Sequence, residues 1–412
     1  MSFDVLAKCQ NAIRVSICIV GLAAPVAVAA KTPPEEPSPS ALKAPQPDAV
    51  DPPTPEALEA AIDRGVDYLL RSQHAKGYWG SARNTKGLNI YAPVPGAHGA
   101  FRAAVTAMSL MALLEVDREK QNEKITAAID RGAAWLLENL DDVRGATPDA
   151  IYNVWTHAYG IQALVRLHAR TSDEAQRSKM RALIEHQIDM LDRYESVDGG
   201  WGYYDFNVGS RVPTSSSTSF INAAVLVALH EASEIGIAPP EKMLQKALAA
   251  TERQRKPDCS YFYGEYLKHQ PMAGINRPGG SVGRSQACNL ALYLWKQKPI
   301  NQAVMAAWLD RLFTRGGWLD IGRKRPVPHE SWFQVAGYFY YFGHYYGALC
   351  IAELPAEQRP FYQAHMAHTL LARQEKEGSW WDYPFYDYHE AWGTSFALMT
   401  LVRCREEPKK EY

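Results

Sequence analysis

The sequence predicts an all-α protein, a single α6/α6 toroid (an α/α barrel) built from six helix pairs. The first reason is a repeat, in which similar points at residues 73, 140, 195, 254, 313 and 374 follow one another at intervals of 55 to 67 residues. The second is an alternation of half-polar segments with segments that are apolar on nearly all sides. The third is that no series of segments shows the alternating pattern of β-strands.

The first outer helix shows the repeat most completely. Thr54 is its expected N-cap and Pro55 its first residue. An apolar stripe with helical spacing runs along it, made of Leu58, Ile62, Val66 and Leu69. The helix is expected to end at Gln73. The short loop that follows, which we call the exit, contains Gly77 and Trp79.

The same exit recurs along the chain. Gln374, Gly378 and Trp380 repeat it with the same spacing, and residues 129–137 nearly duplicate residues 62–70. In the less complete copies, the position of the glutamine is held by Leu140, Glu195, Gln254 or Phe313. Each copy marks the end of one predicted outer helix.

The second helix of each pair is apolar almost all round. These segments are residues 103–116, 154–167, 220–232, 285–295, 340–354 and 392–402. A helix without a polar face is normally buried. We therefore expect these six to form the inner wall of the ring, and the half-polar helices to form the outer wall.

The glutamine and tryptophan exit resembles the QW repeat of the squalene and oxidosqualene cyclases and of the protein prenyltransferase β subunits, over residues 54–404. The resemblance implies that Gln73, Trp79, Gln374 and Trp380 tie each outer helix to the next element and perform no chemistry. It also implies that the central cavity takes an isoprenoid or another apolar small molecule.

The family's catalytic motifs are incomplete here. Neither the DxDD motif of squalene-hopene cyclases nor the DCTAE motif of their eukaryotic relatives occurs. The prenyltransferases bind zinc through an Asp-x-Cys pair on one inner helix and a histidine on the next. Cys288 and His344 match the cysteine and the histidine, but Gln286 stands at the aspartate position, so the resemblance implies only part of a zinc site.

The two ends of the chain differ in composition from the repeat region. Residues 1–30 have the charged start, apolar middle and small-residue end of a secretory signal peptide, or alternatively of a membrane anchor. Residues 31–53 form a Pro-rich linker without an expected fold, and residues 405–412 form a polar tail. We expect export to the periplasm or cell envelope, near a membrane. The net charge of −1 gives no support for nucleic-acid binding, and nothing predicts an oligomer.

The connections before the inner helices are the expected place of function, because in a toroid these helices all begin around one mouth. Together with the inner helices they supply four candidate catalytic residues, His157, His344, His389 and Asp387. Arg277 and Arg284 flank a glycine-rich loop and are candidates for an anionic head group. Tyr341, Tyr345, Trp381 and Tyr388 are candidate ligand-binding aromatics, suited to an isoprenoid cation or to stacking against a sugar.

The leading interpretation is an exported, terpenoid cyclase-like or prenyltransferase-like toroid that binds or acts on an isoprenoid or other apolar ligand. Two alternatives stay open. One is a toroid that acts on polysaccharides as a lyase or hydrolase, since α/α toroids also serve those reactions. The other is a ring that only binds, because fold alone does not fix chemistry.

Overall fold

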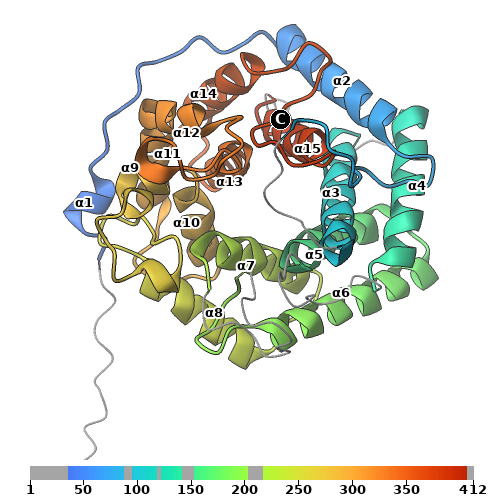
Figure 1. Cartoon of the computed structure of the whole chain (residues 1–412), viewed down its shortest axis with the longest axis horizontal. Helices are drawn as coiled ribbons and strands as arrows, with labels where there is room; N and C mark the ends of the chain where they lie inside the picture. The colour runs from blue at the N-terminus through green and yellow to red at the C-terminus, as the bar shows by residue number, and fades with distance from the viewer. Residues whose placement is uncertain (1–35, 88–94, 118–121, 142–152, 203–216, 406–412) are drawn as a thin grey trace, which may run out of the picture. The chain divides into compact units, whose positions relative to one another are not determined.

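Helices form two concentric walls around one axis in this protein, as its computed structural model shows (Figure 1). The structure describes residues 36–87, 95–117, 122–141, 153–202 and 217–405. The inner wall consists of α3 (Pro95–Val116), α5 (Asn153–Arg170), α7 (Ser219–Glu234), α10 (Ser285–Leu294), α13 (Phe339–Ala352) and α15 (His389–Val402). The outer wall consists of α2 (Pro55–Ser72), α4 (Glu123–Asn139), α6 (Glu174–Tyr194), α8 (Glu241–Gln254), α11 (Gln302–Arg315) and α14 (Arg359–Leu371).

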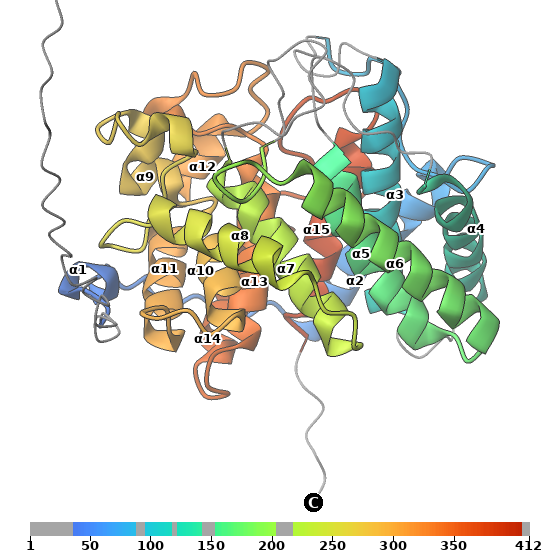
Figure 2. The same ribbon diagram turned by 90° about the horizontal axis from the view of Figure 1, so that it is seen from below.

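The inner helices form a closed ring. Each packs against the next in chain order, and α15 packs against α3. Each outer helix lies against the inner helix that precedes it, while α2 lies against α15 (Figures 1 and 2). Within the described part of the chain the only β-structure is two isolated bridges. The predicted α6/α6 toroid is therefore confirmed.

The predicted helices form for the reasons read from the sequence. Thr54 caps α2 by accepting a hydrogen bond from the Ala57 N–H at 3.2 Å, and Pro55 is its first residue. The six all-round apolar segments coincide with the six inner helices, except that Trp295, Glu353 and Leu354 lie just beyond the ends of α10 and α13. The stretch His98–Val116 within α3 is long and apolar enough to cross a membrane, but it lies mostly buried inside the ring, as expected of a core helix.

The glutamine and tryptophan of the repeat join neighbouring helices. The Gln73 side-chain amide donates to the carbonyls of Gly77 and of Ala128 in α4, both at 2.9 Å. The Trp79 indole N–H donates to the Leu69 carbonyl at the end of α2, at 2.8 Å. These contacts satisfy carbonyls that a helix end leaves without a partner.

We call this glutamine–glycine–tryptophan connection between outer helices the joint. Its last copy, at Gln374, Gly378 and Trp380, closes the ring. Gln374 donates to the Ala61 carbonyl of α2 at 2.9 Å, across more than three hundred residues of sequence. Trp380 donates to the Leu370 carbonyl at the end of α14, at 2.9 Å. The last and first outer helices are therefore held together by the same kind of contact as α2 and α4.

Glycine is required at the joint because two backbones approach closely there. Gly77 and Gly378 have φ angles of +99° and +97°. A Cβ on Gly77 would lie 2.2 Å from the Arg131 carbonyl oxygen, and a Cβ on Gly378 would lie 2.4 Å from that of Arg64. The Arg-Gly pairs of α4 and α2, Arg131-Gly132 and Arg64-Gly65, are thus the surfaces that receive these two exits.

The Pro-rich segment is more ordered than the sequence predicts. Its described part, residues 36–53, contains the short helix α1 (Pro39–Leu42) and runs around the outside of the ring from α11 to α2 (Figure 1). Arg311 of α11 donates to the carbonyls of Ser40 at 2.6 Å and Lys43 at 2.9 Å. Backbone carbonyls and one buried alanine thus hold a segment that lacks large apolar side chains. The predicted signal peptide, residues 31–35 and residues 406–412 lie outside the described residues.

Candidate functional site

A cavity of about 140 Å³ opens among the N-terminal turns of the inner helices. Helices α3, α5, α7, α13 and α15 contribute to its wall, together with residues 328–329 and 382–385 of the connections. Its aromatic wall includes Phe101, Trp155, Phe220, Phe342, Tyr388 and Trp392. The inner helices therefore do begin around one mouth, and the polar groups Asp382, His329 and His389 face the same space.

Asp382 is the one carboxylic acid in the described cavity lining, and it is buried. Its Oδ2 accepts a hydrogen bond from the Tyr341 N–H at 3.0 Å, and its carbonyl accepts one from the Lys324 N–H at 2.5 Å. Burial raises the pKa of Asp382 to about 7, because the Tyr341 N–H and the Arg323 charge offset only part of the lost solvation. The carboxyl group is therefore fixed in place and close to half protonated at neutral pH.

Two histidines reach the cavity from different elements. His389, the first residue of α15, binds the Tyr386 carbonyl through Nδ1 at 2.6 Å. Its buried Nε2 has no hydrogen-bond partner among the described residues and lies 3.5 Å from the Glu390 carboxylate. His329 binds the Gln334 carbonyl through Nδ1 at 2.7 Å and the Tyr338 hydroxyl through Nε2 at 3.1 Å. Burial lowers the pKa of His329, so this imidazole is neutral at pH 7.

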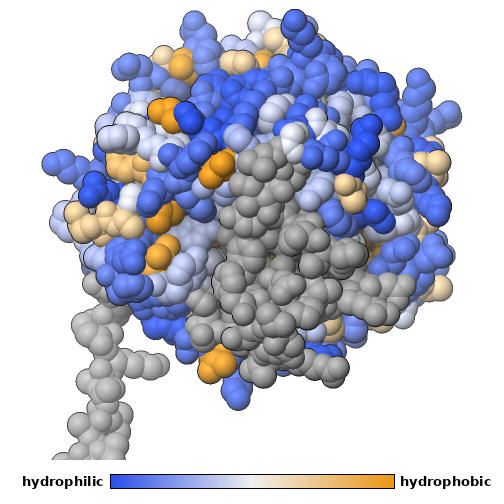
Figure 3. Space-filling view, viewed as in Figure 1, coloured by the Kyte–Doolittle hydropathy of each residue, from blue (hydrophilic) through white to orange (hydrophobic). Residues whose placement is uncertain are grey.

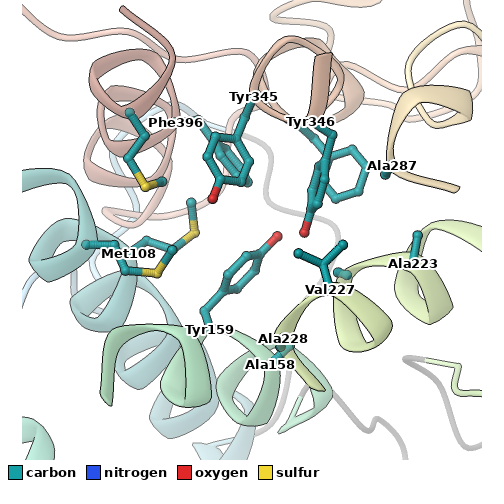
Figure 4. Packing of buried hydrophobic residues seen from close by; sticks show 14 of the residues in the cluster. Met108, Ala158, Tyr159, Ala223, Val227, Ala228, Ala287, Tyr345, Tyr346 and Phe396 are labelled. Atoms are coloured by element: carbon teal, nitrogen blue, oxygen red, sulfur yellow. The ribbon is translucent and has the colours of Figure 1, made fainter. Parts of the chain in front are cut away.

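Below the cavity, three tyrosines form a second layer on the axis of the ring. Tyr159 lies one turn after Trp155 in α5, and Tyr346 lies one turn after Phe342 in α13. Their hydroxyl groups and that of Tyr345 are buried and point toward the axis (Figure 4). The Tyr345 hydroxyl has no hydrogen-bond partner in the described part of the chain, whereas the Tyr159 and Tyr346 hydroxyls lie close enough to interact and to shift each other's pKa.

A network of ion pairs forms the third layer, at the C-terminal ends of the inner helices. Arg166 of α5 pairs with Glu115 of α3 at 3.1 Å and with Glu231 of α7 at 2.6 Å. Arg403, which caps α15, donates to Glu115 at 3.0 Å. The network joins four inner helices and closes the end of the ring opposite the cavity.

Of the predicted catalytic residues, only His389 lines the cavity. The His157 ring of α5 binds Gln187 of the outer helix α6 at 2.7 Å, and His344 binds the Tyr340 carbonyl of its own helix at 2.7 Å. Burial lowers the pKa of each to about 4. Both histidines are therefore neutral and serve helix packing.

Asp387 and Trp381 lie beside the site rather than in it. Asp387 accepts a hydrogen bond from the Ser81 hydroxyl at 2.8 Å and so ties two connections together. The Trp381 ring lies between the ammonium groups of Lys86 and Lys324, at 4.9 and 4.4 Å, and its plane is nearly perpendicular to the His389 ring. The Trp381 ring therefore packs edge-on against the His389 ring.

The two arginines do not form the predicted anion site. Arg284 is fully buried, and its guanidinium donates to the carbonyls of Gly280, Tyr261 and Ile275 at 2.6 to 2.7 Å. Burial lowers its pKa to about 10. Arg277 is exposed and donates to the Met272 carbonyl at 3.0 Å. Arg284 organises the loop from within, so its charge is not presented to a ligand.

The remaining aromatic candidates divide between layers. Tyr388 lines the cavity, and its hydroxyl contacts His98. Tyr345 belongs to the deeper tyrosine layer, and Tyr341 acts through the backbone N–H that holds Asp382. The sequence drew attention to the connections that contain Asp382, His329 and Trp392, but it did not choose these three from the other polar and aromatic residues there, and it did not indicate Trp155.

A zinc site at Cys288 and His344 finds no third ligand in the structure. The Cys288 thiol donates to the Ser219 carbonyl at 3.4 Å, and burial raises its pKa to about 12, which disfavours the thiolate that binds metal. Among the described residues no group of three His, Cys, Asp or Glu side chains is placed to hold an ion. The four described cysteines are free thiols.

The fold and the site define an α/α toroid with an aromatic cavity that carries one carboxyl and two imidazole groups. No protein-family model matches the chain, and no curated protein matches it. Solved structures do: cellobiose 2-epimerase from Spirochaeta thermophila has a TM-score of 0.54 at 16% identity, covering 85% of this chain and 96% of that one. An α-1,6-mannanase of Salegentibacter, solved with α-1,6-mannotriose, has a TM-score of 0.52 at 10% identity, covering 85% and 98%.

An unsaturated glucuronyl hydrolase from Streptococcus agalactiae is similar to the same degree, with a TM-score of 0.53 at 14% identity over 86% of this chain and 93% of that one. At these identities the likeness establishes the toroid fold alone. The proteins found are nevertheless named for sugars, which contradicts the predicted terpenoid assignment and isoprenoid ligand. The reason for the error is physical. The glutamines and tryptophans that suggested the terpenoid group are bonded within helix joints, so they report the architecture and carry no information about the ligand.

Proposed function

We propose that this protein binds a carbohydrate in the aromatic cavity and acts on it by acid–base chemistry. The observation that carries the proposal is the convergence of Asp382, His329 and His389 on one space with aromatic walls. A pocket that is mostly apolar with a few convergent polar groups is the usual form of a small-molecule site. A sugar offers both apolar C–H faces for the aromatic rings and hydroxyl groups for the polar ones.

Each polar group has a distinct capacity for proton transfer. Asp382, with a pKa of about 7, can both give and accept a proton near neutral pH. His389 presents a buried Nε2 that lies 3.5 Å from the Glu390 carboxylate, an arrangement that favours a proton on this nitrogen. His329 is neutral and shares a hydrogen bond with Tyr338, so it can accept a proton that the tyrosine hydroxyl helps to direct.

The lining favours one kind of reaction on the sugar over another. Hydrolysis of glycosides generally uses a pair of carboxyl groups on opposite sides of the scissile bond. The described lining supplies one carboxyl group with two imidazoles. This set suits reactions that begin with removal of a proton from carbon. In epimerisation the proton returns to the same carbon from the opposite face, in isomerisation it returns to the neighbouring carbon, and in elimination a leaving group departs from the neighbouring carbon with the proton of an acid. That the similar structures include proteins named as a sugar epimerase and a mannose isomerase is in keeping with this choice.

The test is a screen of the purified protein against mono- and oligosaccharides with three readouts. Deuterium uptake from D₂O at a sugar carbon reports epimerisation or isomerisation, and absorbance of an unsaturated product reports elimination. New reducing ends without an unsaturated product report hydrolysis. We expect activity in one of the first two, lost in Asp382→Asn and in His389→Ala. His186→Gln, an exposed histidine on the outer wall, is the matched control and should retain it.

Binding alone is the competing function. It predicts that a sugar quenches the fluorescence of the cavity tryptophans Trp155 and Trp392, without turnover and equally in Asp382→Asn. A protein whose fluorescence and activity respond to no sugar would refute the proposal. Export by residues 1–30 is a further proposal that would bring the protein to envelope or extracellular glycans, and cell fractionation tests it.

A further inference from the structure

Trp332 is the most exposed large aromatic side chain among the described residues, with 66% of its surface accessible. It begins the short 3₁₀ turn η3 (Trp332–Gln334) in the connection between α12 (Gly317–Gly322) and α13. Large apolar side chains are seldom left this exposed without a binding role when others gather beside them.

The connection that presents Trp332 is strained and firmly held. His329, Phe333 and Gln334 have φ angles of +66°, +60° and +55°, a region that side chains other than glycine seldom adopt. The Ser331 hydroxyl donates to the Val335 carbonyl at 2.7 Å, and Gln334 Oε1 accepts a hydrogen bond from the Ile275 N–H at 3.2 Å. Strained backbone that the surroundings maintain is characteristic of functional sites.

Phe333, next to Trp332, is partly buried against the core, and the two rings meet edge-on with their centroids 6.2 Å apart. A Cβ placed on Gly279 of α9 (Pro278–Ser281) would lie 3.0 Å from the Phe333 ring. The residues on either side of Trp332 are therefore anchored, by Ser331 to Val335 and by Phe333 to the glycine-rich loop. Trp332 itself is exposed on a segment of backbone whose neighbouring residues are held in place.

Trp332 continues the cavity outward. Pro328 and His329 of the same connection line the cavity, and Trp332 follows His329 by three positions, so their Cα atoms are at most about 11 Å apart. Two further exposed apolar residues, Tyr266 and Met272, lie on the adjoining loop, which contacts Phe333 and Gln334 through residues 274–275. We call Tyr266, Met272 and Trp332 the outer rim. The described part of the face seen in Figure 3 is mainly hydrophilic, with small separate hydrophobic spots in the region of α9 and α12.

The size of the cavity decides what the outer rim would hold. At roughly 10–15 Å³ per water-sized group, the cavity of about 140 Å³ holds about ten such groups, comparable to the roughly twelve non-hydrogen atoms of one hexose. A second or third sugar ring of the same chain must therefore lie outside the cavity, at its mouth.

We propose that the outer rim is a subsite where Trp332 stacks on a sugar ring beyond the one in the cavity, so that the substrate is the end of an oligosaccharide or polysaccharide. This inference rests on the proposed function. It specifies that the protein discriminates by chain length, and that a free monosaccharide uses only part of the site.

The experiment measures sugar binding by isothermal titration calorimetry for wild type, Trp332→Ala, Trp332→Phe and Phe361→Ala. Each protein is titrated with the same sugar series, from mono- to pentasaccharide. Phe361 is exposed on the outer helix α14 and is the matched control. For wild type we expect affinity to rise with chain length. In Trp332→Ala the ratio of tetrasaccharide to monosaccharide affinity should fall about three- to tenfold, the worth of one stacking contact. Trp332→Phe should recover part of it, and Phe361→Ala should leave the ratio unchanged.

Three outcomes overturn the proposal. If wild type binds sugars and Trp332→Ala keeps the same length dependence, the subsite is refuted while the proposed function stands. If Trp332→Ala instead abolishes binding to lipid vesicles and leaves the sugar series unaltered, the rim is a membrane contact. If wild type binds no sugar of any length, the proposed function and the subsite fail together.

Discussion

Asn in place of Asp382 should stabilise the protein increasingly as the pH rises. Burial raises the pKa of Asp382 from 3.8 to about 7, so the folded protein binds a proton that the unfolded chain releases. The sign follows from linkage: stability falls as the pH rises from 3.8 to 7, since ionisation is disfavoured only in the folded state. At about 1.4 kcal/mol per pKa unit, the full cost is about 4 kcal/mol above pH 8, of which about 2.5 kcal/mol develops between pH 5 and pH 8.

Asparagine removes this cost while keeping an oxygen that accepts the Tyr341 N–H. Urea unfolding of wild type and Asp382→Asn at pH 5 and pH 8 measures it, because other titrating groups cancel in the difference. We expect the advantage of the variant to grow by about 2.5 kcal/mol between the two pH values. Asp141→Asn, at an exposed carboxylate, should show no such change. An advantage that is constant, or that shrinks toward pH 8, would refute the buried, proton-binding state on which the proposed chemistry depends.

Three further substitutions test the scaffold by urea unfolding. Gln374→Ala removes the hydrogen bonds that close the ring, and we expect a loss of about 1–3 kcal/mol, against little change for the exposed Gln302→Ala. Gly378→Ala must place a Cβ 2.4 Å from a carbonyl at positive φ, so a loss under 1 kcal/mol would contradict the close approach. Glu115→Gln leaves two arginines underpaired and should cost about 3 kcal/mol. Burial opposes ionisation of Glu115, but Arg403 and Arg166 outweigh it and lower its pKa, so wild type should lose this contribution as the pH falls below about 4, while the variant should not.

The toroid was predictable because its cause lies in local sequence. Thr54 caps a helix whether or not the ring forms, and an apolar segment such as residues 340–354 must be buried wherever it goes. One of the contacts in the joint is also local in sequence, because the Trp79 indole N–H donates to the Leu69 carbonyl of the helix that precedes it. Six repetitions of one unit then leave few arrangements other than a closed ring.

The site was predictable only as a region. The rule that inner helices begin at one mouth correctly pointed to the connections that contain His329, Asp382 and His389. It gave no means of choosing among the polar residues there. His157 and His344 looked equivalent to His389 in sequence, yet each bonds to a helix instead of facing the cavity.

By itself, the sequence determined the helices, their pairing and the closure of the ring, because periodicity, caps and joints act over short stretches. The tertiary structure alone decided which side chains share a space. Burial of Asp382 depends on contacts between segments far apart in the chain, because the cavity beside it is lined by residues from Phe101 to Trp392. Those contacts set solvation and hence pKa, so the chemistry of the site is a property of the folded ring and not of any motif.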